Sequence, residues 1–385
     1  MNELRRKIEA EIRERGPIPF SRYVEMCLYD PEFGYYSRNA AQFGKAGDFY
    51  TSSDVHAVFG RLLARQFEEM WRVLGSPVPI VIRELGPGRG LFAQDVLDWS
   101  ERKFPEFFRA LRYELVERST ALRARIEHTL SRRFESGKAT LSEGQENPHF
   151  SRRERARNGA PKDLSTIVFA NEFVDAIPVE IVSHRGSLRI DARDGRFVET
   201  WASPSAEELE FLDRYSIHPE EGERIEATLQ AQREMLPACE IESGFVVVID
   251  YGYTREEQLA GRHRGTVKAI RQHSVSANPY EAPGEQDITA DVNFTALAAV
   301  AEKQGLYAQK LMTQSQFLMG IGEANQFADA FEECRLPRER AKVALQLKHL
   351  VTPAGMGESF HVLIASKGVD SKKVLGLSGL GFGRR

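Results

Sequence analysis

Apolar residues in this chain follow two patterns, short continuous runs and helical repeats. The continuous runs predict strands and the repeats between them predict helices: strands at 79–85, 111–117, 164–170 and 244–250, and helices at 91–103 and 119–134. Continuous apolar strands separated by helices are typical of a parallel sheet covered on both faces. The fold class that we expect is therefore α/β, a doubly wound sheet.

The segments around this core divide the chain further. Helical periodicity before the first strand predicts an N-terminal helical extension, residues 1–78, packed on a core at 79–385. Two insertions into the core are expected, at about 179–240 and 320–350. The first begins with alternating antiparallel segments at 179–201 and continues with helices at 205–215 and 222–236; a final strand pair is expected at 306–312 and 360–366.

Composition narrows the class of protein. The content of 42% apolar and 28% charged residues is that of a globular domain, and a net charge of −4 gives no drive toward nucleic acid. The apolar runs are too short to span a bilayer and the first residues form a charged amphipathic helix without a signal-peptide block, so we expect no membrane insertion and a cytoplasmic location. Three separated cysteines and nine histidines without ligand spacing predict no metal site, and the oligomeric state stays open.

The glycine-rich segment 84–90, Glu-Leu-Gly-Pro-Gly-Arg-Gly, follows the first apolar strand directly. A strand that ends in such a turn before a helix can bring backbone N–H groups close to a nucleotide-sized ligand. The spacing of the glycines argues against a dinucleotide cofactor, because a dinucleotide fingerprint needs its third glycine where this chain has Leu91. An ordinary strand-to-helix turn is the alternative.

The pattern that is present, Glu-x-Gly-x-Gly-x-Gly, resembles motif I of class I S-adenosylmethionine (SAM) methyltransferases. The resemblance implies that SAM is bound at Gly86, Gly88 and Gly90. Glu84 can face the cationic end of such a cofactor or order the glycine turn through backbone N–H groups.

Glu117 ends the second predicted strand, just before a helix. A carboxylate there can accept hydrogen bonds from both ribose hydroxyls, each worth about 1.5–3 kcal/mol. The alternative is that Glu117 interacts with the helix dipole, an effect of about 0.3–1 kcal/mol. We expect the ribose role, since motif I lies at the neighbouring strand.

Four further motifs occur in order along the chain: 29–36 (YDPEFGYY), 47–52 (GDFYTS), 171–178 (NEFVDAIP) and 284–294 (GEQDITADVNF). Together they resemble the MidA-like family over about residues 15–365. That family contains the mitochondrial methyltransferase needed for assembly of respiratory complex I, which methylates an arginine of a core subunit. The resemblance implies a SAM-dependent protein arginine methyltransferase whose partner is a protein such as a complex I subunit.

Two positions depart from the family pattern. Ser53-Asp54 replaces the usual Pro-Glu and keeps an acid, which should be a mild change. Tyr253 stands where the family usually has histidine after Asp-Tyr-Gly. Because tyrosine titrates near pH 10, histidine-based proton transfer from that position is in doubt.

Arginine is a demanding methyl acceptor because its guanidinium stays protonated and presents donors instead of lone pairs. A pair of carboxylates can hold the planar group, aim one nitrogen and accept the proton. Glu172 and Asp175 follow the fourth strand and are our candidates for this role; they share a face if the turn is helical, and Asn171 is a third candidate. The alternative is that these residues cap a helix.

Two loops complete the predicted site. Asp48, Thr51 and Ser52 lie in a loop before the sheet that could close over the cofactor, although Gly-Asp is also a common turn dipeptide. Residues 287–293 belong to a long polar segment that we expect to act as a lid at the acceptor side.

Three functions remain open at this point. The first is a protein arginine methyltransferase that uses SAM. The second is a SAM-binding assembly factor or scaffold with little turnover, although Glu84, Glu117 and the three glycines argue for retained cofactor binding. The third is N-methylation of a small molecule or a nucleobase, the latter weakened by the absence of a basic stripe.

Overall fold

The computed structural model describes residues 3–38, 57–144, 164–271, 274–276 and 278–383. The chain forms two compact units, each assembled from separate stretches of sequence. The N-terminal unit consists of Met1–Phe49, Glu172–Leu236 and Tyr251–Val300, and the sheet unit consists of Tyr50–Asn171, Pro237–Asp250 and Ala301–Arg385.

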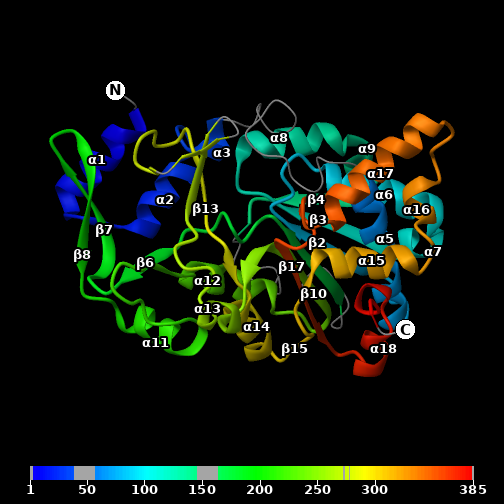
Figure 1. Cartoon of the computed structure of the whole chain (residues 1–385). Helices are drawn as coiled ribbons and strands as arrows, with labels where there is room; N and C mark the ends of the chain where they lie inside the picture. The colour runs from blue at the N-terminus through cyan, green and yellow to red at the C-terminus, as the bar shows by residue number, and fades with distance from the viewer. Residues whose placement is uncertain (1–2, 39–56, 145–163, 272–273, 277, 384–385) are drawn as a thin grey trace. The chain divides into compact units, whose positions relative to one another are not determined.

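A sheet with the strand order β15-β17-β10-β5-β2-β3-β4 runs through the sheet unit (Figure 1). Its strands are β2 (Ile80–Leu85), β3 (Leu111–Val116), β4 (Ala139–Ser142), β5 (Ser165–Asn171), β10 (Ser243–Tyr253), β15 (Tyr307–Ala308) and β17 (Phe360–Lys367). Two short strands pair at its margins: β14 (Val292–Asn293) with β10, and β16 (Met312–Thr313) with β17. The pairs from β4 through β10 are parallel.

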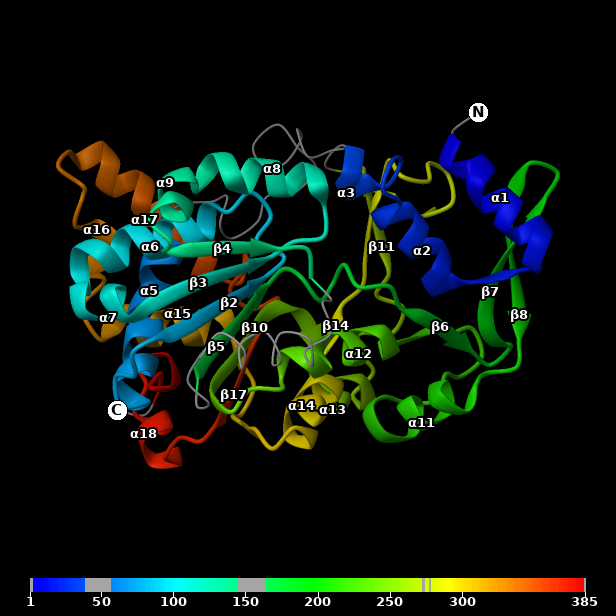
Figure 2. The same cartoon turned by 180° about the vertical axis from the view of Figure 1, so that it is seen from behind.

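Strand β2 lies at the point where the chain order of the sheet reverses, with β3 on one side and β5 on the other (Figure 2). Leu85 of β2 is in register with Val116 of β3 and with Ala170 of β5, so the carboxyl ends of the three strands share one edge. Open α/β sheets bind ligands outside the carboxyl ends of their strands at such a reversal. The glycine turn and Glu117 therefore follow the two strands best placed for a cofactor.

Helices of the sheet unit bury its central strands. Phe92 of α6 stacks on Phe169 of β5 with ring centroids 4.5 Å apart, and Phe67 of α5 meets the same ring edge-on at 5.5 Å. Such ring pairs add about 0.5–1.5 kcal/mol to the burial of their apolar surface. The helices of this unit are α5 (Ala57–Val73), α6 (Leu91–Lys103), α7 (Pro105–Ala110), α8 (Thr120–Thr129), α9 (Ser131–Glu135), α15 (Gln314–Glu323), α16 (Ala328–Phe331), α17 (Pro337–Val351), α18 (Ser371–Leu375) and the 3-10 helix η1 (Ser378–Leu380).

The N-terminal unit contains two smaller antiparallel sheets. One has the order β1-β7-β6-β9 with β8 added to β7, and the other has the order β12-β11-β13. Helices α1 and α2 contribute Leu4, Ile8 and Tyr23 to a buried cluster that also contains Leu188 and Ile190 of β7. The strands are β1 (Ile18–Pro19), β6 (Glu180–Ser183), β7 (Gly186–Arg193), β8 (Arg196–Ala202), β9 (Ile225–Ala227), β11 (Lys268–Arg271), β12 (Ser274–Ser276) and β13 (Asp287–Thr289), and the helices α1 (Glu3–Arg15), α2 (Phe20–Tyr29), α3 (Tyr35–Arg38), α11 (Ala206–Tyr215) and α13 (Arg255–Leu259). Two more helices, α12 (Leu229–Ala238) and α14 (Phe294–Lys303), each extend from this unit into residues of the sheet unit.

The structure confirms the α/β class and the mostly parallel sheet. The four strands predicted for the core are present within one or two residues except β10, which extends three residues further, and α6 has the predicted bounds. Of the predicted final pair, 360–366 is β17, whereas 306–312 contains only the two-residue strand β15 and the start of β16. The antiparallel segments at 179–201 are the strands β6, β7 and β8. The helix expected at 119–134 is interrupted at Leu130, which divides it into α8 and α9.

Two predictions about local structure were wrong. The helix expected at 222–236 begins only at Leu229, because residues 225–227 form β9 and pair with β6. The segment 287–293, expected to be a lid, contains β13 and β14, and both Asp287 and Asn293 are buried. In both places a strand partner distant in sequence fixes the backbone, which overrides local propensity.

The division of the chain into an extension at 1–78 and a core at 79–385 stays a prediction. The two compact units divide the chain differently, since residues 50–78 belong to the sheet unit and residues 1–49 to the N-terminal unit. Within the described part of the chain, every helix is too short or too polar to cross a membrane.

Candidate cofactor and acceptor site

The glycine turn leads from β2 into α6 through three residues with left-handed backbone. Gly86, Gly88 and Gly90 have φ values of 65°, 55° and 75°, a region that strains other residues. The Gly86 N–H donates to Val116 O on the neighbouring strand at 3.0 Å, and the Gly90 N–H donates to Pro87 O at 2.8 Å. The turn is therefore held at both ends by the backbone.

The glycine turn borders open space. A Cβ atom added at Gly88 would meet no heavy atom within 4 Å. Gly90 is the N-cap of α6 and offers no capping side chain, so the first backbone N–H groups of α6 remain available to a bound group. A cofactor site at this turn needs both the open space and the uncapped N–H groups.

Glu84 lies near the end of β2 and is almost completely buried, with 4% of its surface exposed. The Tyr113 hydroxyl donates to its Oε2 at 2.9 Å. Burial raises the pKa of Glu84 to about 8, the Tyr113 hydrogen bond opposes this, and the charge of Glu117 adds to it. Among the described residues no backbone N–H of the glycine turn donates to this carboxyl, so the predicted alternative in which Glu84 orders the turn has no support.

Glu117 follows β3 and is also buried, at 8% exposure. Its Oε1 accepts a hydrogen bond from the Ser119 N–H at 2.8 Å, and Ser119 is the N-cap of α8. Burial raises the pKa of Glu117 to about 7, and the hydrogen bond from Ser119 lowers it. One oxygen of Glu117 therefore binds the N-terminus of α8, as in the alternative considered from the sequence. The carboxylate has further lone pairs that can accept hydrogen bonds from ribose hydroxyls.

These groups fit a nucleoside cofactor that carries positive charge. Glu84 and Glu117 interact electrostatically; Glu84 lies in β2 and Glu117 follows the adjacent parallel strand β3, at the reversal point of the sheet. A cation near Glu84 would favour its ionised form, because the unpaired buried charge is otherwise costly. Two buried carboxyls beside a glycine turn are what the sequence predicts for a SAM site.

The acceptor-side candidates lie in the turn that follows β5. Asn171 is the last residue of β5, and residues 172–177 form turns and bends instead of the helix on which a shared face for Glu172 and Asp175 depended. Glu172 has a φ value of 49°, an unusual conformation for a residue with a side chain. The condition for a shared helical face is therefore not met, because β5 passes directly into this turn.

Asp175 is held by a segment distant in sequence. Its Oδ2 accepts a hydrogen bond from Thr289 Oγ1 at 2.9 Å, and its backbone carbonyl accepts the Ala290 N–H at 3.1 Å. Burial raises the pKa of Asp175 to about 6, the Thr289 hydrogen bond lowers it, and the charge of Asp291 raises it further. A carboxylate with this pKa is a stronger base than an ordinary aspartate.

The remaining predicted cofactor residues, Asp48, Thr51 and Ser52, lie outside the residues that the structure describes.

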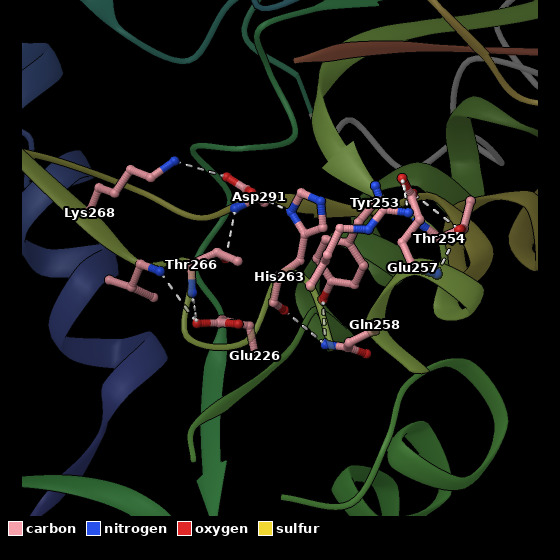
Figure 3. Close-up of polar contacts among 11 residues, drawn as sticks. Glu226, Tyr253, Thr254, Glu257, Gln258, His263, Thr266, Lys268 and Asp291 are labelled. Atoms are coloured by element: carbon pink, nitrogen blue, oxygen red, sulfur yellow. Dashed lines mark hydrogen bonds and ion pairs between the residues drawn. The ribbon is translucent and has the colours of Figure 1, made fainter. Parts of the chain in front are cut away.

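Tyr253, at the end of β10, is fully buried. Burial raises its pKa, and the charges of Glu226 and Asp291 raise it further, so its hydroxyl stays neutral. His263 stacks on the Tyr253 ring with centroids 5.2 Å apart and an interplanar angle of 17° (Figure 3). Sequence reasoning missed His263 and the buried Glu226; the one signal for His263 was its place in a turn between Gly261 and Gly265.

Comparisons with known proteins agree with this geometry. A family model for S-adenosyl-L-methionine-dependent methyltransferases matches residues 62–312, more than half of the chain. The chain is 28% identical to the Drosophila melanogaster protein arginine methyltransferase NDUFAF7 homolog, mitochondrial, over 97% of this chain and 88% of that protein. It is 26% identical to human protein arginine methyltransferase NDUFAF7, mitochondrial, over 92% of this chain and 81% of the human protein.

A solved structure is similar over nearly the whole length. It is a COG1565 superfamily member from Burkholderia thailandensis bound to S-adenosyl-homocysteine, with a TM-score of 0.79 and 27% identity, covering 96% of this chain and 93% of that chain. A native structure of a COG1565 superfamily protein from the same organism has a TM-score of 0.78. The reversal-point sheet, the glycine turn and the matched family model lead to one conclusion: this chain belongs to the family of S-adenosyl-L-methionine-dependent methyltransferases, the MidA-like group expected from its motifs.

Proposed function

We propose that this methyltransferase transfers the methyl group of SAM to an arginine side chain of a partner protein. The observation that carries the proposal is the similarity, over 92–97% of the chain, to proteins named protein arginine methyltransferases. A subunit of respiratory complex I is the partner class that the resemblance implies. Cytoplasmic location is part of the proposal, while the two animal relatives carry names that state a mitochondrial one.

In this proposal the sheet unit holds the cofactor. Gly86, Gly88 and Gly90 let the backbone approach it, Glu84 faces its ammonium group, and Glu117 accepts hydrogen bonds from its ribose hydroxyls. Asp48, Thr51 and Ser52 complete the cofactor side. The support from the described residues is chemical: two buried carboxyls that gain from a cationic, hydroxyl-bearing ligand.

Glu172 and Asp175 are the proposed catalytic carboxylates, with Asn171 as a polar neighbour. Asp175 is buried, and its raised pKa makes it suited to accept a proton from a guanidinium. Glu172 holds a strained backbone at the end of β5, and strain of this kind, worth about 1–3 kcal/mol, gathers at functional sites.

The test is a transfer assay with methyl-labelled SAM. The purified protein is incubated with extract from cells that lack it, and the proteins are hydrolysed and searched for methylarginine by mass spectrometry. Labelled methylarginine in a protein fraction is the expected result, and a Glu84→Gln variant should lower the yield. Label on small molecules or on another amino acid would overturn the proposal, and SAM binding without any transfer would favour the scaffold function.

A further inference from the structure

The imidazole of His263 has a fixed orientation. Its Nδ1 lies 3.0 Å from Asp291 Oδ2, and its ring stacks on Tyr253 (Figure 3). The hydrogen bond fixes the rotation of the ring in its plane, and the stacking fixes the plane. Asp291 favours the tautomer that carries its proton on Nδ1, which leaves the lone pair on Nε2.

The backbone of His263 is also held in an unfavourable conformation. Its φ value is 54°, in the left-handed region. Gly261 and Gly265 in the same turn also have positive φ values, 86° and 73°, but a glycine adopts them without strain, whereas a histidine does not. Gln258 Nε2 donates to the His263 carbonyl at 3.3 Å and to the Tyr253 hydroxyl at 3.4 Å, so it ties the strained residue to its stacking partner. A side chain kept at a strained position by several partners indicates a function for that side chain.

The segment Thr289 to Asp291 connects this imidazole to the proposed acceptor carboxylate. Thr289 and Ala290 bind Asp175 through the side chain and the backbone, and the next residue, Asp291, binds His263. The charge of Asp291 acts on the Asp175 carboxyl. His263 and Asp175 are therefore held by three consecutive residues of one segment within the N-terminal unit.

Charged and polar groups surround the Asp291 carboxylate that pairs with His263. The Asp291 carboxylate also accepts a hydrogen bond from Lys268 Nζ at 3.2 Å, and the Asp291 backbone N–H donates to Thr266 Oγ1 at 3.0 Å. Glu226 is buried, its Oε1 accepts the Thr266 N–H at 2.7 Å, and its charge interacts with that of Asp291.

We infer that His263, oriented by Asp291, accepts the proton that the acceptor nitrogen loses during methyl transfer, an inference that rests on the proposed function. The nitrogen lone pair forms the new N–C bond while the C–S bond breaks and leaves its electron pair on sulfur. The displaced N–H proton passes to His263 Nε2, and the resulting imidazolium is paired with Asp291. Under this inference Glu172 and Asp175 hold the guanidinium, and His263 takes over from Asp175 the role of proton acceptor.

The first experiment measures transfer by a His263→Gln variant of the full chain. We expect kcat to fall about 10²-fold, in the range of general-base contributions, with the SAM Kd unchanged. Asp291→Asn should lower kcat less than His263→Gln does, because the proposed base, His263 Nε2, is still present. The matched control is His218→Gln, because His218 also pairs with an aspartate, Asp213 at 2.7 Å, but both side chains are more than half exposed.

The second measurement separates catalysis from structure. The rate of the native enzyme should rise with pH in step with the titration of the His263 ring followed by ¹⁵N NMR, and this rise should be absent from His263→Gln while the variant keeps its melting temperature. The same spectra should show the Nδ1–H tautomer. A full rate in His263→Gln, an unchanged pH profile or an Nε2–H tautomer would each overturn the inference. If the native enzyme methylates no arginine at all, the proposed function fails and this inference fails with it; arginine methylation that is indifferent to His263 would overturn the inference alone.

Discussion

The proposed cofactor side and the proposed acceptor side of this enzyme are built in opposite ways. Glu84, the glycine turn and Glu117 come from one stretch of sequence, on two adjacent parallel strands with matched registers. On the acceptor side, Asp175, His263 and Asp291 come from three stretches that hydrogen bonds bring together. The cofactor side is therefore specified by a local motif, and the acceptor side by tertiary contacts.

The difference has a physical origin. A turn between a strand and a helix needs only local backbone freedom, which the glycines supply. Fixing a base beside an acceptor needs contacts that hold a side chain in one rotamer, and such contacts come from whichever segments pack there. Substitutions on the two sides should therefore separate binding of SAM from transfer of its methyl group.

Glu172→Gln should have the largest effect. The amide keeps the size of the side chain but loses its charge and basicity, so transfer should fall about 10²-fold or more while SAM affinity stays unchanged. Initial rates with methyl-labelled SAM and calorimetric SAM binding measure the two properties. Glu281→Gln, an exposed residue of the same unit, is the control. Full turnover by Glu172→Gln would exclude the carboxylate from the mechanism.

Glu117→Ala should weaken the binding of SAM. Loss of the ribose hydrogen bonds should weaken SAM binding by about 10-fold or more, at about 1.4 kcal/mol for each factor of ten. Glu114→Ala is the matched control, since Glu114 lies on the same strand and pairs with Arg83 at 2.8 Å. Equal SAM affinity in the native protein and in Glu117→Ala would remove the ribose assignment.

Binding of SAM should release protons near neutral pH. The pKa values of Glu84 and Glu117 are raised to about 8 and about 7, and a cationic ligand with hydroxyl donors favours both ionised forms. Affinity should therefore rise about 3- to 10-fold from about pH 6 to about pH 8. Calorimetry in two buffers with different ionisation enthalpies counts the protons. An identical enthalpy in both buffers at pH 7 would contradict the assignment.

The smallest expected effect concerns stability. Buried carboxyls on both sides have raised pKa values: Glu84 at about 8, Glu117 and Glu226 at about 7 and Asp175 at about 6. A raised folded-state pKa means that the folded protein binds more protons than the unfolded chain, so stability falls as pH rises from about 4.5 to about 8. Urea unfolding across this range measures the slope.

Saturating SAM sharpens this last measurement. With SAM bound, Glu84 and Glu117 should no longer contribute to the change of unfolding free energy with pH. The contribution of Asp175 and Glu226 should remain. Glu226→Gln should remove a part that SAM does not affect. A slope that SAM abolishes entirely would show that the two sides do not titrate separately.

Sequence patterns predicted the sheet unit well because its signals are local. The apolar runs of β2, β5 and β10 are buried on both faces, and the bounds of α6 follow from its periodicity and from the glycine before it. The strand order adds the reversal at β2, which places the glycine turn where open α/β sheets bind their ligands.

The acceptor side was predicted less well because its geometry depends on pairing. Residues 225–227 look helical in isolation, yet β9 pairs with β6 and buries Glu226. The role of Thr289 in holding Asp175, and the stacking of His263 on Tyr253, involve residues 114 and 10 positions apart, respectively. No local pattern carries such information.

The alternation of the two units along the chain has a consequence for synthesis. Each unit is made of three separate stretches, so every contiguous fragment that contains one whole unit also contains part of the other. Strand β10 acquires its neighbour β17 only when residues 360–367 have left the ribosome. The sheet therefore cannot be completed during most of translation, and until then the exposed edge of β10 is a template for wrong pairing. A nascent chain of this enzyme should depend on chaperones until its last strand is made.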